Sequence, residues 1–136
     1  MLGQIYLSMA KPLDAIPAYQ KSVDLKPSAP QLRLALATAQ LATENTALAP
    51  AALQNLKAAS MAENDDVFTW YETAQAYSLM KNEAMANLST AEAYYNAGAV
   101  RQAGIFAIRA RRGLEQGGPD WQRANDIVGI ASTPQR

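Results

Sequence analysis

The sequence contains neither cysteine nor histidine. The lack of cysteine excludes disulfide bonds and thiol chemistry, and the lack of histidine removes the commonest general base and the commonest zinc ligand. Twelve basic and twelve acidic residues cancel, so no global positive field attracts nucleic acid or an anionic lipid surface. No apolar run approaches the roughly 18 to 20 residues that cross a bilayer. We therefore expect no catalytic residue, no cofactor, no metal site, no nucleic-acid partner and no membrane span.

Aromatic residues are also scarce. They make up 7% of the chain, whereas hydrophobic residues make up 49%, so alanine and leucine must supply most of the buried surface. These two residues favour close-packed helices over a sheet. With 136 residues, the chain has the length of one domain or of part of a larger one. Its start, MLGQIYLSMA, lacks the basic region and long apolar core of a signal peptide. It reads as a helix already under way, which indicates a piece of a longer protein.

The most informative stretch covers residues 91–114, AEAYYNAGAVRQAGIFAIRARRGL. Gly98 suits the left-handed residue that ends a helix, because it has no Cβ to clash. After it, Ala103, Ala107 and Ala110 recur at helical spacing and form a thin stripe of small side chains. Such a stripe lets two backbones approach closely, so the stretch predicts a tight antiparallel helical hairpin.

Similar units recur along the chain, as in a helical repeat protein. The first unit carries Leu2-Gly3, Tyr6, Ala15, Tyr19 and Pro27. That spacing resembles the tetratricopeptide (TPR) pattern. A second unit follows with Leu36, Ala37, Gln40, Ala52, Leu56 and Ala59, and a third with Trp70, Ala74, Tyr77, Ala86 and Ala93. The hairpin described above, with Tyr94, is the fourth; it overlaps the third, so one helix near residues 83–96 serves both.

Local signals place eight helices, at residues 1–10, 13–25, 29–43, 47–62, 66–80, 83–97, 100–114 and 119–131. Asp65 and Asp66 favour a helix start, because carboxylates are stabilised at the positive end of the helix dipole. Pro17 lies inside the second helix, where a proline removes a hydrogen bond, so we expect a late helix start or a kink there. The last helix carries an apolar face that would cap the stack, formed by Trp121, Ala124, Ile127, Val128 and Ala131.

One specific resemblance covers nearly the whole chain. The segments AEAYYNAGAVRQAGIFAIRARRGL and PDWQRANDIVGIA, supported by PLDAIPAYQKSVDLKP and WYETAQAYSLMKNEAMANLSTAEAYY, resemble the C-terminal TPR region of BepA-type periplasmic zinc metalloproteases. These enzymes maintain outer-membrane assembly in Gram-negative bacteria. In that family a His-Glu-x-x-His zinc helix precedes the TPR region. Because this sequence has no histidine, no catalytic or metal residue carries over, and the resemblance implies a non-catalytic module.

TPR arrays bind extended peptides on a concave face lined mainly by the first helix of each hairpin. On that register we expect a partly apolar protein-binding groove. Its lining residues would be Gln4, Leu7, Leu34, Thr38, Leu41, Phe68, Tyr71, Gln75 and Tyr95. The alternative is that Leu34, Leu41 and Phe68 simply pack between hairpins. Tyr77 shares the core-facing register of Tyr6 and should be structural, whereas Tyr71 should face the groove.

Charged residues offer four weaker readings. A lysine-based clamp for a C-terminal carboxylate is not expected, because its places hold Gln4, Thr38, Gln75 and Glu92. Glu63, Asp65 and Asp66 fit helix capping better than a metal site, and Glu72 and Glu92 fit polar lining better than an acid/base pair. The basic residues near the C-terminus suit a solvated helix end better than a patch for an acidic partner; they are Arg101, Arg109, Arg111, Arg112 and Arg123.

These observations predict an all-α chain: a TPR-like α-α superhelix, or solenoid, of about eight antiparallel helices in four hairpins. Residues 1–131 would form a single repeat domain, followed by a tail at 132–136. The expected role is a protein–protein interaction scaffold for a protein or extended peptide. By resemblance it would be the periplasmic C-terminal region of a metalloprotease, docking on the protease domain or on outer-membrane assembly components. The alternatives are a free-standing TPR adaptor of another assembly and, less favoured, an enzyme acting alone.

Overall fold

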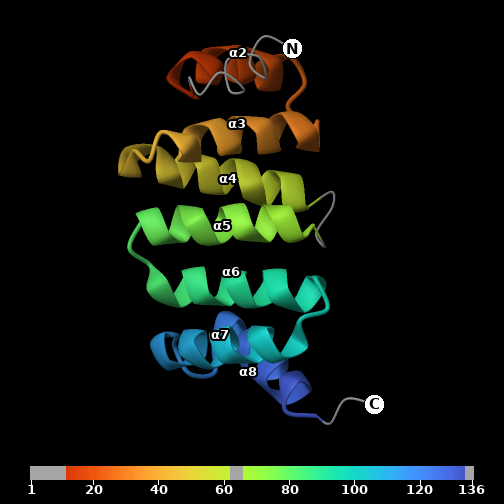
Figure 1. The fold of residues 1–136 in the computed structure, drawn as a ribbon. Helices are drawn as coiled ribbons and strands as arrows, with labels where there is room; N and C mark the ends of the chain where they lie inside the picture. Colours follow the sequence, from red (N-terminus) through yellow and green to blue (C-terminus); the bar gives the residue numbers. More distant parts are fainter. Residues whose placement is uncertain (1–11, 62–65, 134–136) are drawn as a thin grey trace. The chain divides into compact units, whose positions relative to one another are not determined.

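The computed structural model describes residues 12–61 and 66–133, and these residues form helices and turns only. The all-α prediction is therefore confirmed for the described part of the chain. Figure 1 labels the α-helices. The described residues contain seven α-helices and one short 3₁₀ helix. In chain order they are α2 (Pro12–Leu25), α3 (Pro30–Ala42), η1 (Thr46–Leu48), α4 (Ala49–Ser60), α5 (Val67–Leu79), α6 (Glu83–Asn96), α7 (Val100–Gly113) and α8 (Pro119–Ala131).

Every predicted helix that lies in the described residues is present, and its ends agree within two residues. The predicted helix at 1–10 lies outside them. The expected late start at Pro17 is wrong, because α2 begins at Pro12 and continues through Pro17. The inner face of α2 explains why the helix tolerates this proline: Ala15, Tyr19 and Val23 are all buried, and their packing offsets one missing hydrogen bond.

The chain divides into two compact units, residues 1–64 and 65–136, a division that the sequence did not indicate. In the first unit, α3 packs against both α2 and α4. The α2–α3 contact is a small apolar cluster in which Tyr19 and Leu36 are the largest side chains. The α3–α4 contact buries mostly alanine and leucine, as the composition suggested.

A chain of side-chain hydrogen bonds crosses the α3–α4 contact. Arg33 donates from Nε to the Pro27 carbonyl (2.9 Å) and from Nη1 to Asn55 Oδ1 (3.1 Å). Asn55 in turn donates from Nδ2 to Gln40 Oε1 at 3.1 Å. Both amide side chains are buried, so these bonds satisfy groups that would otherwise lose water without compensation. These hydrogen bonds therefore fix the register between α3 and α4.

In the second unit, α6 is the central helix, because it contacts α5, α7 and α8. The predicted stripe on α7 is confirmed: Ala103, Ala107 and Ala110 are fully buried in a cluster with Leu88 and Ala91 of α6. The face predicted for the last helix is confirmed in its centre, where Ala124 and Ile127 are fully buried. Small residues on α7 thus allow α6 and α8 to approach it closely.

Two helices of this unit end in the same hydrogen-bond pattern. After α6, the Gly98 N–H donates to the Tyr95 carbonyl (3.1 Å) and the Ala99 N–H to the Tyr94 carbonyl (2.9 Å). This is a Schellman motif, and Gly98 adopts the predicted left-handed conformation with φ of 83°. After α5, Lys81 occupies the equivalent position with φ of 59°, although a lysine has a Cβ. These tight turns fix how α5, α6 and α7 align as antiparallel neighbours.

Candidate functional site

Three aromatic rings form a continuous row across α5, α6 and α7. The rings of Tyr71 on α5 and Tyr94 on α6 meet edge to face, with centroids 6.3 Å apart and an interplanar angle of 73°. Tyr94 stacks on Phe106 of α7 at 5.4 Å and 17°. The guanidinium carbon of Arg109 lies 5.0 Å from the centroid of the Phe106 ring. We call Tyr71, Tyr94 and Phe106 the aromatic ladder.

The turns explain why these rings meet. Consecutive helices joined by a short turn pack as antiparallel neighbours, so a side chain on one helix can contact a side chain on the next. Tyr71 and Tyr94 flank the turn at Lys81, and Tyr94 and Phe106 flank the turn at Gly98. Both distances and ring angles fall in the range that aromatic pairs prefer. The ladder therefore joins three helices that follow one another in the chain.

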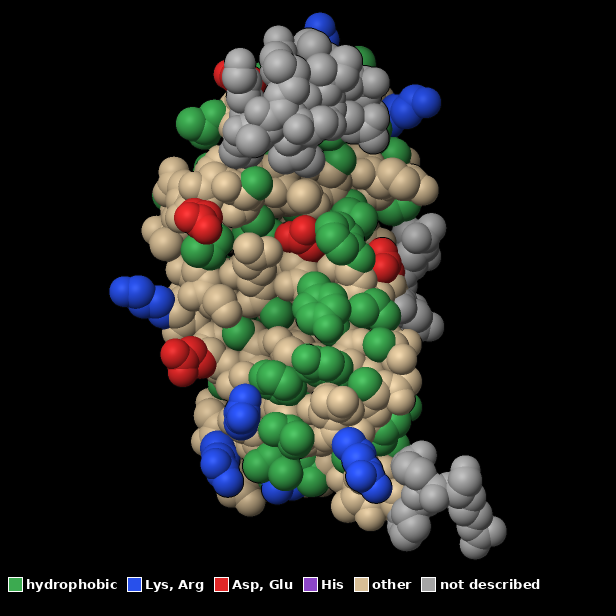
Figure 2. Space-filling model, in the orientation of Figure 1, with side chains coloured by type: hydrophobic (Ala, Val, Ile, Leu, Met, Phe, Trp, Pro, Cys, Tyr) green, Lys and Arg blue, Asp and Glu red, His purple; other side chains and the backbone are tan. Residues whose placement is uncertain are grey.

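The ladder lies at the surface. Tyr71 keeps 47% of its side chain exposed, and its neighbour Phe68 keeps 49%. Tyr94 and Phe106 are half-buried, because each also packs on the alanine cluster beneath. Figure 2 shows hydrophobic side chains gathered over α5, α6 and α7, with Lys and Arg side chains beside those over α7. A row of apolar rings partly open to water is available to a ligand that covers it.

The groove residues predicted in the second unit divide into two groups. Phe68, Tyr71 and Gln75 are exposed on α5, as the register predicted. Tyr77 is buried, which confirms its separate assignment to the core. Tyr95 is half-buried and lies under Arg123, whose guanidinium carbon is 5.1 Å from the ring centroid. Tyr95 thus belongs to a contact between α6 and α8 and takes no part in the ladder.

Tyr94 and Phe106 were not among the residues predicted to line the surface. Tyr94 was assigned only to the fourth hairpin, and Phe106 had no predicted role. Equal spacing from the turn would not have found the pair, because Tyr94 lies four residues before Gly98 and Phe106 lies eight residues after it. Arg109 was noted only for its charge, whereas the structure places it against an aromatic ring.

In the first unit, Leu34 and Thr38 are half-buried on α3. Leu41 is 1% exposed, so it is part of the interior and its side chain lines no open surface. The remaining predicted groove residues, Gln4 and Leu7, lie outside the described residues.

Two carboxylates of the second unit, Asp66 and Glu92, have structural partners. Asp66 caps α5 by accepting hydrogen bonds from the Phe68 N–H (3.0 Å) and the Thr69 hydroxyl (3.1 Å), as predicted. Glu92 is buried and accepts from Arg123 Nε at 2.8 Å and Nη2 at 2.6 Å. This hydrogen bond raises the pKa of the Arg123 guanidinium, while partial burial acts in the opposite direction. Glu72 is also buried on α5.

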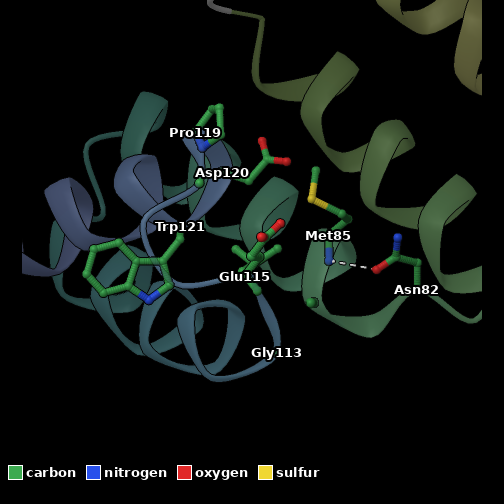
Figure 3. Close-up of a pocket in the computed structure, with 10 residues that line it drawn as sticks. Asn82, Met85, Gly113, Glu115, Pro119, Asp120 and Trp121 are labelled. Carbon is green, nitrogen blue, oxygen red and sulfur yellow. Dashed lines mark hydrogen bonds between the residues drawn. The ribbon is translucent and has the colours of Figure 1, made fainter.

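A pocket of about 290 Å³ lies where the starts of α6 and α8 meet the end of α7. Its polar lining includes Asn82, Glu115 and Asp120, and its apolar lining includes Met85 and Trp121. In the view of Figure 3, the two carboxylates lie between Met85 on one side and Trp121 on the other. Asn82 is engaged in capping, because its side chain accepts from the Met85 N–H at 3.2 Å. Both carboxylates are exposed.

Within residues 12–61 and 66–133, no group of three or more acidic side chains is placed to hold a metal ion. In the same ranges, no helix is long and apolar enough to cross a membrane. No family model matches this chain, and no curated protein matches it.

Proposed function

We propose that this protein is a non-catalytic, TPR-like interaction module that binds an extended segment of another protein. The observation that carries the proposal is the aromatic ladder, a row of contacting rings that crosses three helices and stays partly open to water. Tyrosine and phenylalanine give large contact areas for few rotatable bonds, and aromatic residues dominate binding energy at protein interfaces.

The shape of the ladder supports an elongated ligand. Each ring comes from a different helix, so a ligand that touches all three must run across the helices rather than along one of them. Gln75 is exposed on α5 and supplies an amide that can donate to or accept from a peptide backbone. Apolar rings with a few orienting polar groups are the usual composition of a peptide-binding surface.

The resemblance to BepA-type proteases supports a narrower form of the proposal. In that form the module is the C-terminal, periplasmic region of a zinc metalloprotease, and its partners are the protease domain or outer-membrane assembly components. The alternative is a free-standing TPR adaptor of another assembly. The open reading frame upstream of Met1 separates the two, because the protease form requires a His-Glu-x-x-His helix encoded there.

The general proposal is tested with an array of random-sequence peptides probed by the wild-type protein and by Tyr71→Ala. We expect the wild type to bind a subset of the peptides. Tyr71→Ala should weaken that binding at least about fivefold, because losing an aromatic anchor costs about 1 kcal/mol or more. Leu13→Ala is the matched control, since Leu13 is also an exposed large apolar residue but lies on α2. Equal binding by Tyr71→Ala and wild type would reject the ladder as the binding surface.

A fold control accompanies this test. Tyr71→Ala should leave the melting temperature nearly unchanged, since surface substitutions usually change stability by less than about 0.5 kcal/mol. Tyr77→Ala should lose roughly 3 kcal/mol or more, because Tyr77 is buried. The reverse pattern, with Tyr71→Ala unfolding the protein, would mean that Tyr71 holds the fold together.

A further inference from the structure

We propose that the ladder and the outward side of α7 together bind a peptide with two different halves, one apolar and one acidic. The outward side is formed by Arg101, Ile105, Arg109 and Arg112, and we call it the arginine face. This inference rests on the proposed function and adds the chemistry and the direction of the ligand. The acidic half would lie over α7 and the apolar half over α5.

The arginine face is a single side of one helix. Its residues follow one another at intervals of four, four and three positions, which places them on the same side of α7. The three arginines are exposed, and Ile105 keeps 51% of its side chain exposed between them. Helix α7 contains no acidic residue. The result is a positively charged strip with an apolar centre, next to Phe106 of the ladder.

The other two arginines of the region are paired with polar side chains of the fold. Arg111 donates to Asn125 Oδ1 at 2.8 Å, and Arg123 pairs with Glu92. Among the described residues, by contrast, no ion pair joins a carboxylate to Arg101, Arg109 or Arg112. Their guanidinium groups are therefore available to a ligand from outside.

The helix dipole does not account for the whole arginine face. Arg112 lies in the last turn of α7, where a cation is stabilised. Arg101 lies in the first turn, where the dipole disfavours a positive charge. Arg109 is held over the Phe106 ring, which leaves the edge of its planar guanidinium able to donate two hydrogen bonds. The set as a whole fits recognition of carboxylates better than stabilisation of the helix.

Charge is distributed unevenly along the ladder, and this sets the direction of the ligand. At the α7 end the rings adjoin the arginines, whereas α5 contains neither lysine nor arginine. Aspartate and glutamate in the ligand would pair with guanidinium groups at one end, and leucine or phenylalanine would cover Tyr71 and Phe68 at the other. A lipid surface fits less well, because lipid-binding segments typically cluster about four to eight cations.

Fluorescence anisotropy with labelled peptides tests the inference. The probe has a leucine- and phenylalanine-rich half and an aspartate- and glutamate-rich half, and two companion peptides replace the acids with glutamine or with lysine. We expect the acidic probe to bind at least about tenfold more tightly than the glutamine peptide, and its affinity to fall as salt rises. The lysine peptide should bind most weakly.

Three protein variants locate the contact. Arg101→Gln/Arg109→Gln/Arg112→Gln should erase the preference for the acidic probe, with an unchanged circular dichroism spectrum because all three side chains are exposed. The matched control is Lys21→Gln/Lys26→Gln/Lys57→Gln, which removes three exposed positive charges from the first unit. It should change the affinity less than about twofold. Ile105→Ala should weaken all the peptides by a similar factor, since it removes apolar contact and keeps the charges.

Each contrary outcome has a distinct meaning. If the wild type binds the glutamine peptide as tightly as the acidic probe, in a Tyr71-dependent way, the arginine face has no role while the proposed function stands. If no peptide binds in a Tyr71-dependent way, the proposed function itself fails. Binding to vesicles of phosphatidylglycerol, with no binding to any peptide, would assign the arginine face to a lipid surface and overturn the inference.

Discussion

Gly104 and Gly129 are both helical glycines, but their surroundings differ. A Cβ added to Gly104 on α7 would lie 2.5 Å from the Cβ of Ala131 on α8, which is too close for two carbon atoms. A Cβ added to Gly129 on α8 would meet no atom within 4 Å. The first glycine is needed for contact between helices, and the second is not.

We therefore expect opposite effects from the same substitution. Gly104→Ala should lower the free energy of unfolding by about 1 kcal/mol, because separating α7 from α8 costs more than the better helix propensity gains. Gly129→Ala should raise it by about 0.5 to 1 kcal/mol, because alanine restricts the unfolded chain and favours the helix. Urea denaturation measures both. Stabilisation by Gly104→Ala would show that α8 is free to move away from α7.

Tyr19 makes stability depend on pH at the alkaline end. Burial raises the pKa of its phenol above the ordinary tyrosine value of about 10. In the unfolded chain the phenol loses its proton near that ordinary value, while the folded protein holds it to higher pH. The folded state thus binds more protons above about pH 10, so Tyr19 contributes stability below that pH and loses it as pH rises.

The measurement compares wild type with Tyr19→Phe by urea denaturation from about pH 8 to 11. The stability difference between them should shift in favour of Tyr19→Phe above about pH 10, since phenylalanine does not ionise. Lysine deprotonation is common to both proteins and cancels in the difference. A constant difference across that range would mean that the phenol is equally accessible in both states.

At the scale of elements, the turns after α5 and α6 have the same geometry but different residues. Gly98 has no Cβ. Lys81 has one, so its backbone is strained at φ of 59°. Lys81→Gly should stabilise the protein by about 1 kcal/mol, and Gly98→Ala should destabilise it by a similar amount. Because a Cβ at Gly98 meets nothing within 4 Å, that loss would come from the backbone alone. Thermal denaturation of the two variants measures both, and equal signs would contradict the shared geometry.

The helices could be predicted closely because local signals agree with one another. Proline at the start of α8, the glycine after α6 and the alanine stripe of α7 each depend on neighbouring residues only. The 3₁₀ helix η1 was absorbed into the next helix, because its residues have no pattern that separates them from α4. The late helix start expected at Pro17 was wrong for the opposite reason: the local cost of the proline was known, but the packing of α2 that offsets it is not local.

The candidate surface was harder to predict than the helices. On α5 the sequence correctly predicted that Tyr71 is exposed and that Tyr77 is buried. Helical periodicity alone assigns residues to the sides of a single helix. On α6 the adjacent tyrosines, Tyr94 and Tyr95, point to different neighbours, and periodicity alone does not say which one faces α5. That choice depends on where α7 and α8 pack, which includes the pairing of Glu92 with Arg123 thirty-one positions away.

At the scale of the whole molecule, each unit has its own apolar cluster. One joins α2 to α3, and the other joins α6, α7 and α8. In the second cluster, Ala124 and Ile127 are the buried contributions of α8. Damage to α8 should therefore spread within the second unit and leave the first unit intact.

Ending the chain after Gly118 tests this separation. The truncated protein should lose hydrogen-exchange protection in α6 and α7, because their apolar cluster opens to water, and should keep it in α2 and α3. It should also be less soluble. A chain that ends after Thr133 is the control and should match the wild type. Loss of protection in α3 as well would show that the two units unfold as one.

The alanine stripe of α7 also affects how the protein can evolve. A single base change in an alanine codon yields serine, threonine, proline, valine, glycine, aspartate or glutamate, and only glycine is smaller. Ala103, Ala107 and Ala110 have no exposed surface, so a larger residue must push helices apart and glycine weakens α7 itself. The outward residues of the same helix carry no such constraint. Mutation can therefore change what α7 presents to a partner while selection holds its inner side fixed, and related chains should diverge in specificity before they diverge in fold.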